Sequence, residues 1–325
     1  MRVGIDARSL RRGPPGVATY VRHLLEELPY LDPWDRTWPR NNLFWNQLWG
    51  LWGQLFRQWR LYHAPAYTSP LVNVRPVVLT VHDVAYLARP EWYPYRLDPV
   101  RRGYYRRSLR TARRIIVPSR FSRDEITSRF PPLADRVHVV PLGVGKEFYP
   151  DSEGARRVAE SRRLPERYLL HVGDLHPRRK VEWIIAAGRR LGFPVVLVGR
   201  RLAEIPVDLG TVTVLSDLSL EDLRGVYSGA ELFVYPSLYE GFGLPLLEAM
   251  ACGVPVAAVT CGSIPEVCGD AAVLVPPDPE ALVEGVREAR NRRAELAEAG
   301  LRRAGEFSWR RTARLTEEVY HQACR

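Results

Sequence analysis

The sequence predicts an α/β protein of about two domains, each built around a parallel β-sheet. Its 325 residues correspond to about two domains of ~150 residues each. Short apolar runs that indicate buried strands, such as Leu232–Tyr235, alternate along the chain with segments of helical spacing. Hydrophobic residues make up 46% of the chain, which is typical of a soluble globular protein with a sizeable core.

The first strand and helix are predicted directly at the amino terminus. Residues 3–6 indicate a strand, and apolar residues recur at helical spacing over 17–28. Because the strand begins at once we expect no signal peptide, and no apolar run reaches the ~18 residues of a membrane span. The loop at 11–16 contains Gly13 and Gly16 in a GxxG spacing that an ordinary βα turn also shows. The chain lacks GxGxxG there, which argues against a dinucleotide dehydrogenase.

A tryptophan-rich helix is predicted next, over residues 45–59. Its apolar residues lie on one face, and its other face carries Asn, Gln and Arg but no acid. These apolar residues are Trp45, Leu48, Trp49, Trp52, Leu55, Phe56 and Trp59. Such a helix could lie among lipid headgroups or pack in the core of the first domain. We favour the core, because apolar stripes of helices usually face cores.

Strands at 61–65 and 77–81 follow, and the second leads into His82 and Asp83. The carboxyl end of a strand is where α/β sheets bind ligands, so His82 is a candidate site residue, although a histidine there can also merely cap a loop. The arginine-loaded helix at 101–114 is either a solvated face or a contact for phosphate or lipid. Ser122 is a candidate N-cap of the next helix.

The second half repeats the pattern of strands and helices. A linker is expected over 145–166. Strands are then predicted at 168–172, 195–199, 212–215, 232–235, 256–259 and 272–275, and helices at 220–229, at 279–293 and after Ser308.

The stretch from Leu238 to Met250 predicts a glycine-bearing loop that leads into a helix. Pro245 suits the first helical turn, where its missing N–H costs nothing. Glu240 then lies on the loop and Glu248 in the first turns of the helix. The free backbone N–H groups and the positive end of the helix form an anion site beside both acids. A ligand that carries both phosphate and hydroxyls, such as a nucleotide sugar, fits this arrangement.

This stretch resembles the E-x7-E element of the retaining glycosyltransferases of family 4. The resemblance extends through residues 251–256 and 263–267, and through the T-x-H-D element at 80–83. It implies the GT-B fold, in which two Rossmann-like domains face a central cleft and a C-terminal helix crosses back to the first domain. The expected domains are an acceptor-side domain at 1–145, a nucleotide-sugar-binding domain at 146–306 and the returning helix at 307–325. The first domain is expected to be shortened, because Pro29–Asn42 lacks the strand and helix that the family usually has there.

The resemblance also implies roles for individual residues. Glu248 would accept hydrogen bonds from the ribose diol of the donor. His82 and Glu240 would lie beside the donor sugar as the catalytic pair; the role of Glu240 as base, nucleophile or positioner stays open, and we favour positioning. The donor would also be bound by Gly13, Gly16, Arg178, Arg179, Lys180, Gly241, Phe242, Gly243 and Leu244.

One turn departs from the family pattern. Where the family has an arginine and, five residues later, a lysine for the pyrophosphate, this chain has Asp174 and Arg179. An acid repels phosphate, so we expect Arg178, Arg179 and Lys180 to make the contact instead, since guanidinium groups bind phosphate well. The alternative is that these three residues are only the solvated start of a helix.

By this resemblance the protein moves a hexose from a GDP-mannose- or UDP-glucose-type donor to a glycan or lipid-linked acceptor, with no cofactor and no metal. Its four cysteines show no CxxC spacing and indicate reduced thiols in a cytoplasmic protein. Two alternatives stay open: a nucleotide-sugar epimerase of the same fold, and a non-catalytic, basic surface-binding protein.

Positive charge is concentrated in the first half. Residues 1–150 contain 24 basic and 12 acidic residues, whereas residues 151–325 contain 23 and 25. The asymmetry predicts a phosphorylated acceptor or an anionic membrane surface as a partner, with the protein peripheral at the inner face of the membrane, and nucleic acid is not expected.

Overall fold

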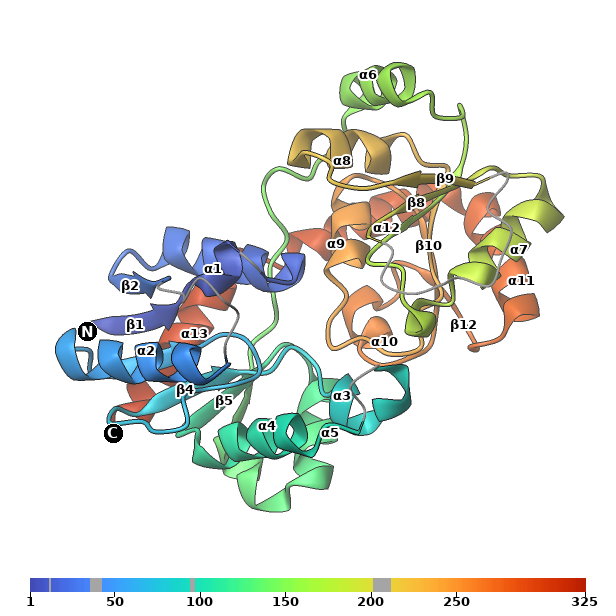
Figure 1. The fold of residues 1–325 in the computed structure, drawn as a ribbon. Coiled ribbons are helices and arrows are strands. Elements are labelled where there is room, and N and C mark those ends of the chain that lie inside the picture. The colour runs from blue at the N-terminus through green and yellow to red at the C-terminus, as the bar shows by residue number, and fades with distance from the viewer. Residues whose placement is uncertain (12, 36–42, 94–96, 201–211) are drawn as a thin grey trace. The chain divides into compact units, whose positions relative to one another are not determined.

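The chain forms two compact units in the computed structural model, which describes residues 1–11, 13–35, 43–93, 97–200 and 212–325 (Figure 1). Unit 1 comprises Met1–Gly143 and Trp309–Arg325, and unit 2 comprises Val144–Ser308. Each unit contains a six-stranded sheet in which the paired strands run parallel. The predicted α/β class, with two Rossmann-like sheets and a last helix that returns to the first, is confirmed.

The sheet of unit 1 has the strand order β2-β1-β3-β4-β5-β6. The side chains of β1, β3 and β4 are buried along their whole length, as expected for strands covered on both faces. The strands are β1 (Val3–Asp6), β2 (Leu31–Trp34), β3 (Leu61–Ala64), β4 (Val77–Thr80), β5 (Arg114–Val117) and β6 (Val137–Val139). The helices are η1 (Arg8–Leu10), α1 (Pro15–Glu27), α2 (Leu43–Phe56), α3 (Ala85–Ala88), η2 (Pro90–Trp92), α4 (Pro99–Thr111), α5 (Arg120–Arg129), η3 (Pro131–Arg136) and α13 (Trp309–Ala323).

Strand β2 corrects the expectation that Pro29–Asn42 lacks a strand. Leu31 and Trp34 are buried, and Pro33 is in register with Ile5 of β1. Proline cannot donate a ladder hydrogen bond, but an edge strand tolerates it, and β2 lies at the edge of the sheet. Helix α2, which follows β2 in the chain, corresponds to the helix predicted over 45–59. Residues 36–42 lie outside the described part, so the expectation of a missing helix stays a prediction.

Helix α13 completes the core of unit 1. His63 of β3 lies with Nδ1 2.6 Å from the hydroxyl of Tyr320 and Nε2 2.8 Å from Oγ1 of Thr80. Burial lowers the pKa of His63 to about 3, so the ring is neutral and has one donor and one acceptor nitrogen. Tyr20 of α1 lies 3.1 Å from the same Thr80 hydroxyl. This buried network ties α13 and α1 to two central strands.

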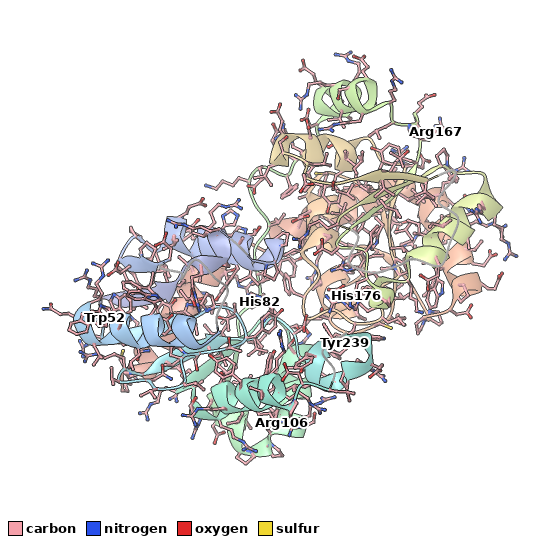
Figure 2. All side chains as sticks on the ribbon, viewed as in Figure 1. Trp52, His82, Arg106, Arg167, His176 and Tyr239 are labelled. Carbon is pink, nitrogen blue, oxygen red and sulfur yellow. The ribbon has the colours of Figure 1, made fainter. Side chains whose placement is uncertain are left out.

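Helix α2 has the reverse of the expected orientation over its last two turns. Gly53 and Gln54 are buried, whereas Trp52, Leu55 and Phe56 are 53%, 52% and 63% exposed. Figure 2 labels Trp52 on this helix. A Cβ at Gly53 would lie 2.6 Å from the ring of Trp59, so the helix packs inward through small and polar residues. The prediction that this stripe faces the core is therefore wrong for these three side chains. It holds for Trp59, which is fully buried beyond the end of the helix; the side chains of Trp45 and Leu48 lie outside the described part.

Two shorter expectations are also corrected. The N-cap of α5 is Ser119, whose hydroxyl accepts a hydrogen bond from the N–H of Ser122 at 3.0 Å. Ser122 is thus the third residue of the helix, the usual donor to a capping side chain. The expected linker at 145–166 contains a helix, α6 (Ser152–Arg162), which Asp151 caps through the N–H of Gly154.

The sheet of unit 2 has the strand order β12-β11-β10-β7-β8-β9. Its strands are β7 (Leu169–Val172), β8 (Val195–Val198), β9 (Val212–Leu215), β10 (Leu232–Tyr235), β11 (Val256–Val259) and β12 (Val273–Val275). Its other helices are η4 (Pro177–Arg179), α7 (Val181–Leu191), α8 (Leu220–Ser228), α9 (Leu244–Ala251), α10 (Ile264–Cys268), α11 (Pro279–Asn291) and α12 (Arg293–Gly305).

Candidate active site

The strand order of unit 2 defines the position of a ligand site. The chain continues from β7 to β8 on one side and from β10 to β11 on the other, and β7 and β10 are neighbours. The loops that leave these two strands therefore diverge at the carboxyl edge of the sheet, the topological switch point where α/β sheets bind ligands. A backbone hydrogen bond from Leu238 N–H to Arg178 O, at 2.8 Å, joins the two loops. The structure thus brings together the loop of Arg178–Lys180 and the loop of Glu240.

Glu240 is held as a buried carboxylate at this point. Its residue is 6% exposed, the Ser237 hydroxyl donates to its Oε1 at 2.7 Å, and Nη1 of Arg179 lies 3.4 Å from the same oxygen. Burial alone would raise the pKa of Glu240, but the positive charges of Arg179 and Arg178 outweigh burial and hold it below the usual value. Glu240 is therefore ionised at neutral pH.

A third loop, between β11 and α10, fixes the backbone of Glu240. The Ser263 hydroxyl lies 2.9 Å from the carbonyl oxygens of both Glu240 and Phe242, and the Ser263 N–H donates to Glu240 O at 3.1 Å. Gly262 precedes it with φ of +61°, and a Cβ there would lie 2.7 Å from Glu240 O. Only glycine allows this close approach, so the carboxylate is anchored through both its side chain and its main chain.

Arg179 is positioned by Tyr235, which is itself held by His171. Its Nη1 donates to the hydroxyl of Tyr235 at 2.6 Å, and the Tyr235 ring stacks on His171 with centroids 5.4 Å apart and planes at 22°. Burial works against the charged form of Arg179, but the Glu240 carboxylate raises its pKa above the ordinary value. Arg179 thus remains charged although its side chain is only 12% exposed.

The neighbouring charges of the first loop have different partners. Lys180 adopts a left-handed conformation with φ of +45°, and its Nζ lies 3.3 Å from a Glu182 carboxylate oxygen. Asp174 forms a two-point contact with Arg200, whose Nε and Nη2 lie 3.1 and 2.8 Å from the two carboxylate oxygens. Burial alone would raise the pKa of Asp174, but the hydrogen bonds from Arg200 hold it lower. Asp174, which stands where the family has a phosphate-binding arginine, is therefore paired with Arg200 in the loop after β8.

Gly241, Phe242, Gly243 and Leu244 form the end of the loop and the start of α9. Gly243 is the N-cap with φ of +101° and no side-chain cap, a conformation that favours glycine. Glu248 lies in the second turn of α9, and Tyr227 donates a hydrogen bond to its Oε2 at 2.8 Å. Burial raises the pKa of Glu248 to about 7, the Tyr227 hydrogen bond acts in the opposite direction, and the charge of Glu147 adds to the increase.

The remaining candidates belong to unit 1. His82 follows β4, and its Nε2 lies 2.9 Å from Pro65 O, so this nitrogen carries the proton and Nδ1 is left as an acceptor. Burial lowers the pKa of His82, which keeps the ring neutral. Gly13 lies in a turn where a Cβ would approach Ser9 Cα at 2.8 Å, whereas a Cβ at Gly16, in the first turn of α1, would meet no atom within 4 Å. Gly13 and His82 thus lie near the carboxyl ends of β1 and β4.

The polar partners of the acids were missed by the sequence reasoning. Tyr235, Ser237 and Ser263 support Arg179 and Glu240, Tyr227 supports Glu248, and Arg200 pairs with Asp174. Three of these residues end or follow strands β10 and β11, so the rule that singled out His82 could also have found them.

Within the described ranges, no group of three or more His, Cys, Asp or Glu side chains is arranged to hold a metal ion. Over the same ranges, no helix has the length and apolar character needed to cross a membrane.

Two parallel Rossmann-like sheets, with a last helix that returns to the first sheet, define the GT-B fold, and the arginine–carboxylate pair lies at the switch point of the second sheet. Among solved structures, the sucrose-phosphate synthase of Thermosynechococcus elongatus matches with a TM-score of 0.79 at 22% identity, over 98% of each chain. Anabaena Alr3699/HepE in complex with UDP-glucose matches with a TM-score of 0.74 at 17% identity, over 99% of each chain.

The chain belongs to glycosyltransferase family 4. Residues 4–148 match the model described as Glycosyltransferase Family 4, and residues 166–291 match that of Glycosyl transferases group 1. The O-antigen chain mannosyltransferase B of Escherichia coli is 33% identical over 281 residues, which cover 80% of this chain and 74% of that protein.

Proposed function

We propose that the protein transfers a hexose from a nucleotide diphosphate sugar to a glycan or lipid-linked acceptor, with retention of the anomeric configuration. The observation that carries the proposal is the buried Glu240–Arg179 pair at the switch point of unit 2. A GDP-mannose-type donor is our first choice, because the relative from Escherichia coli is a mannosyltransferase. A UDP-glucose-type donor is the second, because the structural neighbour from Anabaena is in complex with UDP-glucose.

We assign the donor diphosphate to the cations and amides that surround Glu240. Arg179 uses one guanidinium nitrogen for Tyr235 and Glu240, which leaves other N–H groups of its fork for phosphate oxygens. Arg178, Lys180, the N–H groups of residues 241–244 and the start of α9 would add to the positive potential. Fixed charges of this kind stabilise a leaving diphosphate without rearrangement. They also supply the charge balance that a divalent cation would otherwise provide, so we propose a metal-independent reaction.

We assign Glu240 a positioning role beside the donor sugar. Its carboxylate is ionised and is held by Ser237 and Arg179, so it can accept hydrogen bonds from sugar hydroxyls in a fixed orientation. A donor phosphate oxygen on the same face would take the proton of the acceptor hydroxyl, which accounts for retention. His82 has a free acceptor at Nδ1 and would bind a further sugar hydroxyl. Gly13 and Gly16 would let the backbone of unit 1 approach the phosphates.

A transfer assay tests the proposal. The purified protein is incubated with GDP-mannose, UDP-glucose and related donors, with mannosyl and glucosyl oligosaccharides as acceptors, with and without EDTA. We expect a glycoside with the anomeric configuration of the donor, formed at an unchanged rate in EDTA, and NMR of the product reads the configuration. Inverted product, epimerised donor without transfer, or loss of the reaction in EDTA would each contradict the corresponding part of the proposal.

The titration of Glu248 predicts that donor affinity depends on pH. Its pKa of about 7 means that the carboxylate loses its charge as pH falls through neutrality, and with it an acceptor for the ribose diol. Binding of the nucleotide sugar, measured by calorimetry, is expected to be about tenfold weaker at pH 6 than at pH 8. Glu248→Gln should bind more weakly than the wild type at pH 8 and show no such dependence. A variant that keeps the full pH dependence would show that another group is responsible.

A further inference from the structure

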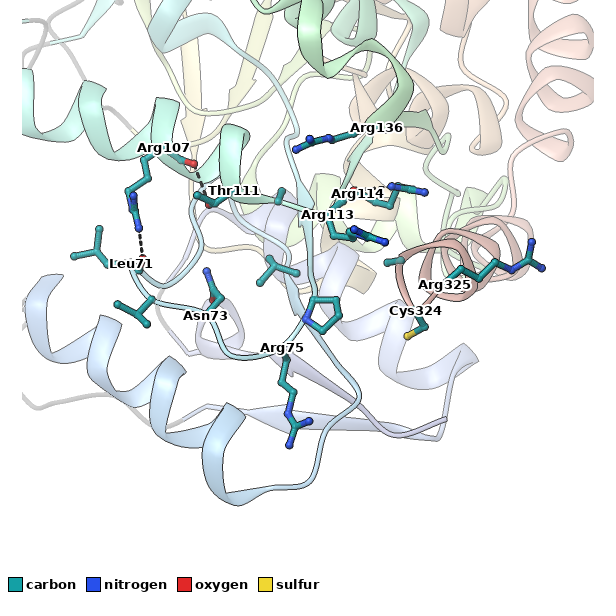
Figure 3. Close-up of a pocket in the computed structure, with 15 residues that line it drawn as sticks. Leu71, Asn73, Arg75, Arg107, Thr111, Arg113, Arg114, Arg136, Cys324 and Arg325 are labelled. Atoms are coloured by element: carbon teal, nitrogen blue, oxygen red, sulfur yellow. Dashed lines mark hydrogen bonds between the residues drawn. The ribbon is translucent and has the colours of Figure 1, made fainter.

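An open hollow of about 710 Å³ lies at the amino edge of the sheet of unit 1 (Figure 3). Its walls come from the loop before β4, the end of α4, the start of β5, the residue before β6 and the last turn of α13. Six of the 15 lining residues are arginines, and none of the lining side chains is an acid. These arginines are Arg75, Arg107, Arg113, Arg114, Arg136 and Arg325, and Figure 3 labels them.

No acidic side chain lines this arginine hollow. Arg107, Arg114 and Arg136 donate to main-chain oxygens, those of Leu71 at 2.6 Å, Arg113 at 2.9 Å and Arg110 at 3.3 Å respectively. Over the described residues, none of these six arginines forms an ion pair with an acidic side chain, and Nε of Arg114 is buried without a hydrogen-bond partner. Guanidinium groups that line one hollow without acidic side chains create a positive potential that an anion would balance. Their planar fork matches the oxygens of a phosphate group.

An exposed apolar surface adjoins the hollow. Leu71 and Val72, which line the hollow, are 42% and 57% exposed, and Val74 in the same loop is 47% exposed. The buried side chain of Gln54 ties this loop to the last turns of α2: its amide donates to Asn73 at 2.8 Å, and its oxygen accepts from Val74 N–H at 3.0 Å. Gln54 thus holds the loop against the last turns of α2, whose exposed residues are Trp52, Leu55 and Phe56.

We propose that this face of unit 1, the arginine hollow with the apolar surface of α2 and residues 71–74, docks on an anionic phospholipid membrane. The arginines bind headgroup phosphates, and the aromatic and aliphatic side chains enter the interfacial layer, where Trp and Phe on a helix face are favoured. The apolar residues that line the hollow with the arginines are Leu71 and Val72, which suit lipid but offer no ring on which a base could stack, so a lipid surface is favoured over nucleic acid.

The placement of this face leaves the other edge of the sheet uncovered. Strand β4 begins at Val77, which lines the hollow, and ends at Thr80, two residues before His82. The docking face and the candidate site of unit 1 thus lie at opposite ends of the same strand, and binding to lipid does not occlude His82.

Sedimentation of the whole chain with vesicles tests the proposal. We expect binding to phosphatidylcholine vesicles that contain phosphatidylglycerol to be at least about tenfold tighter than to phosphatidylcholine alone, because the attraction requires anionic lipid. The triple variant Arg107→Gln, Arg113→Gln, Arg136→Gln should lose most of this difference. The matched control removes the same charge at Arg106, Arg156 and Arg167, which are exposed and lie outside the hollow, and should bind within about twofold of the wild type.

A second variant tests the apolar part. Trp52→Ser with Phe56→Ser should weaken vesicle binding severalfold and should abolish most of the quenching of protein fluorescence by brominated lipid, with the melting temperature unchanged. Inorganic phosphate should compete only weakly, since it offers no apolar contact. The proposal is overturned if the control triple variant loses as much binding as the hollow variant, if the serine variant binds normally, or if single-stranded RNA binds as tightly as anionic vesicles.

Discussion

Glu240→Gln is expected to lower the transfer rate by about 1,000-fold, the upper range for loss of one preorganised electrostatic contact. Glutamine keeps the size of the side chain and its acceptor oxygen for Ser237. It removes the negative charge that balances the buried guanidinium of Arg179. Steady-state kinetics should show the loss in kcat, while donor affinity changes less, because the diphosphate contacts remain.

Glu231 offers a matched control for this substitution. It lies just before β10, at the opposite end of the strand from Glu240, and is equally buried at 6% exposed. It also pairs with arginine, with its carboxylate 3.3 Å from Nη1 of Arg293. Glu231→Gln should cost stability but leave kcat within about twofold, since it removes no charge from the site. Equal losses of kcat in the two variants would mean that Glu240 acts on folding and not on transfer.

Gly173→Ala is expected to reduce kcat/KM by about 100-fold, the cost of displacing a positioned group by roughly 1 Å. Gly173 has φ of +143°, and a Cβ would lie 2.4 Å from Nη1 of Arg179. Arg179 cannot move aside without leaving Tyr235 and Glu240, so the methyl group displaces the guanidinium from its site. Transfer kinetics and donor calorimetry should both show the effect.

Gly192→Ala separates backbone strain from this displacement. Gly192 also has a positive φ, +72°, but a Cβ there would meet no atom within 4 Å. Both alanine variants should lose roughly 1–3 kcal/mol of stability through the unfavourable φ, with the larger loss at Gly173, measured by urea unfolding. Only Gly173→Ala should lose activity; a comparable loss in Gly192→Ala would show that strain alone explains the result.

The parts of the fold that the sequence predicts are those with local signals. The β10–loop–α9 segment could be read from its apolar run, its glycines and Pro245. Strand β2 could not, because Pro33 argues against a strand and only its position at the sheet edge makes proline acceptable. The orientation of α2 could not be predicted from the sequence either, because buried Gly53 and Gln54 are not apolar residues. Their burial depends on contacts with Trp59 and with the loop at 70–75.

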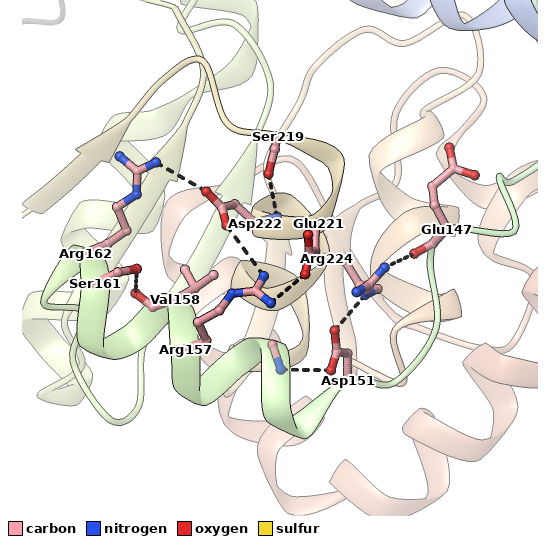
Figure 4. Close-up of polar contacts among 11 residues, drawn as sticks. Glu147, Asp151, Arg157, Val158, Ser161, Arg162, Ser219, Glu221, Asp222 and Arg224 are labelled. Carbon is pink, nitrogen blue, oxygen red and sulfur yellow. Dashed lines mark hydrogen bonds and ion pairs between the residues drawn. The ribbon is translucent and has the colours of Figure 1, made fainter.

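Helix α6 shows how a polar segment acquires structure from distant partners. Its arginines bind acids of α8: Arg157 Nη1 lies 2.5 Å from Glu221, and Arg162 Nη2 lies 3.2 Å from Asp222 (Figure 4). The capping residue Asp151 also accepts a hydrogen bond from Arg224 at 2.7 Å. These partners are some 60 to 73 residues away in the sequence, so composition alone indicated a linker.

The candidate site was predictable in its charged residues but not in the contacts among them. Arg179 and Glu240 could each be selected from the sequence, yet their pairing follows from the adjacency of β7 and β10. Strand order depends on the whole sheet, so it cannot be predicted from the sequence of either loop. The same is true of Ser263, which reaches Glu240 from a third strand.

Unit 1 consists of two chain segments that are far apart in the sequence, and this has a consequence for biosynthesis. Its last segment, Trp309–Arg325, leaves the ribosome after the whole of unit 2, and Trp309, Val319 and Tyr320 are buried in it. The apolar side chains of Met1–Gly143 that contact α13 therefore stay uncovered while the 165 residues of unit 2 are translated. The later-made unit is contiguous and can fold first, which reverses the usual amino-to-carboxyl order of co-translational folding.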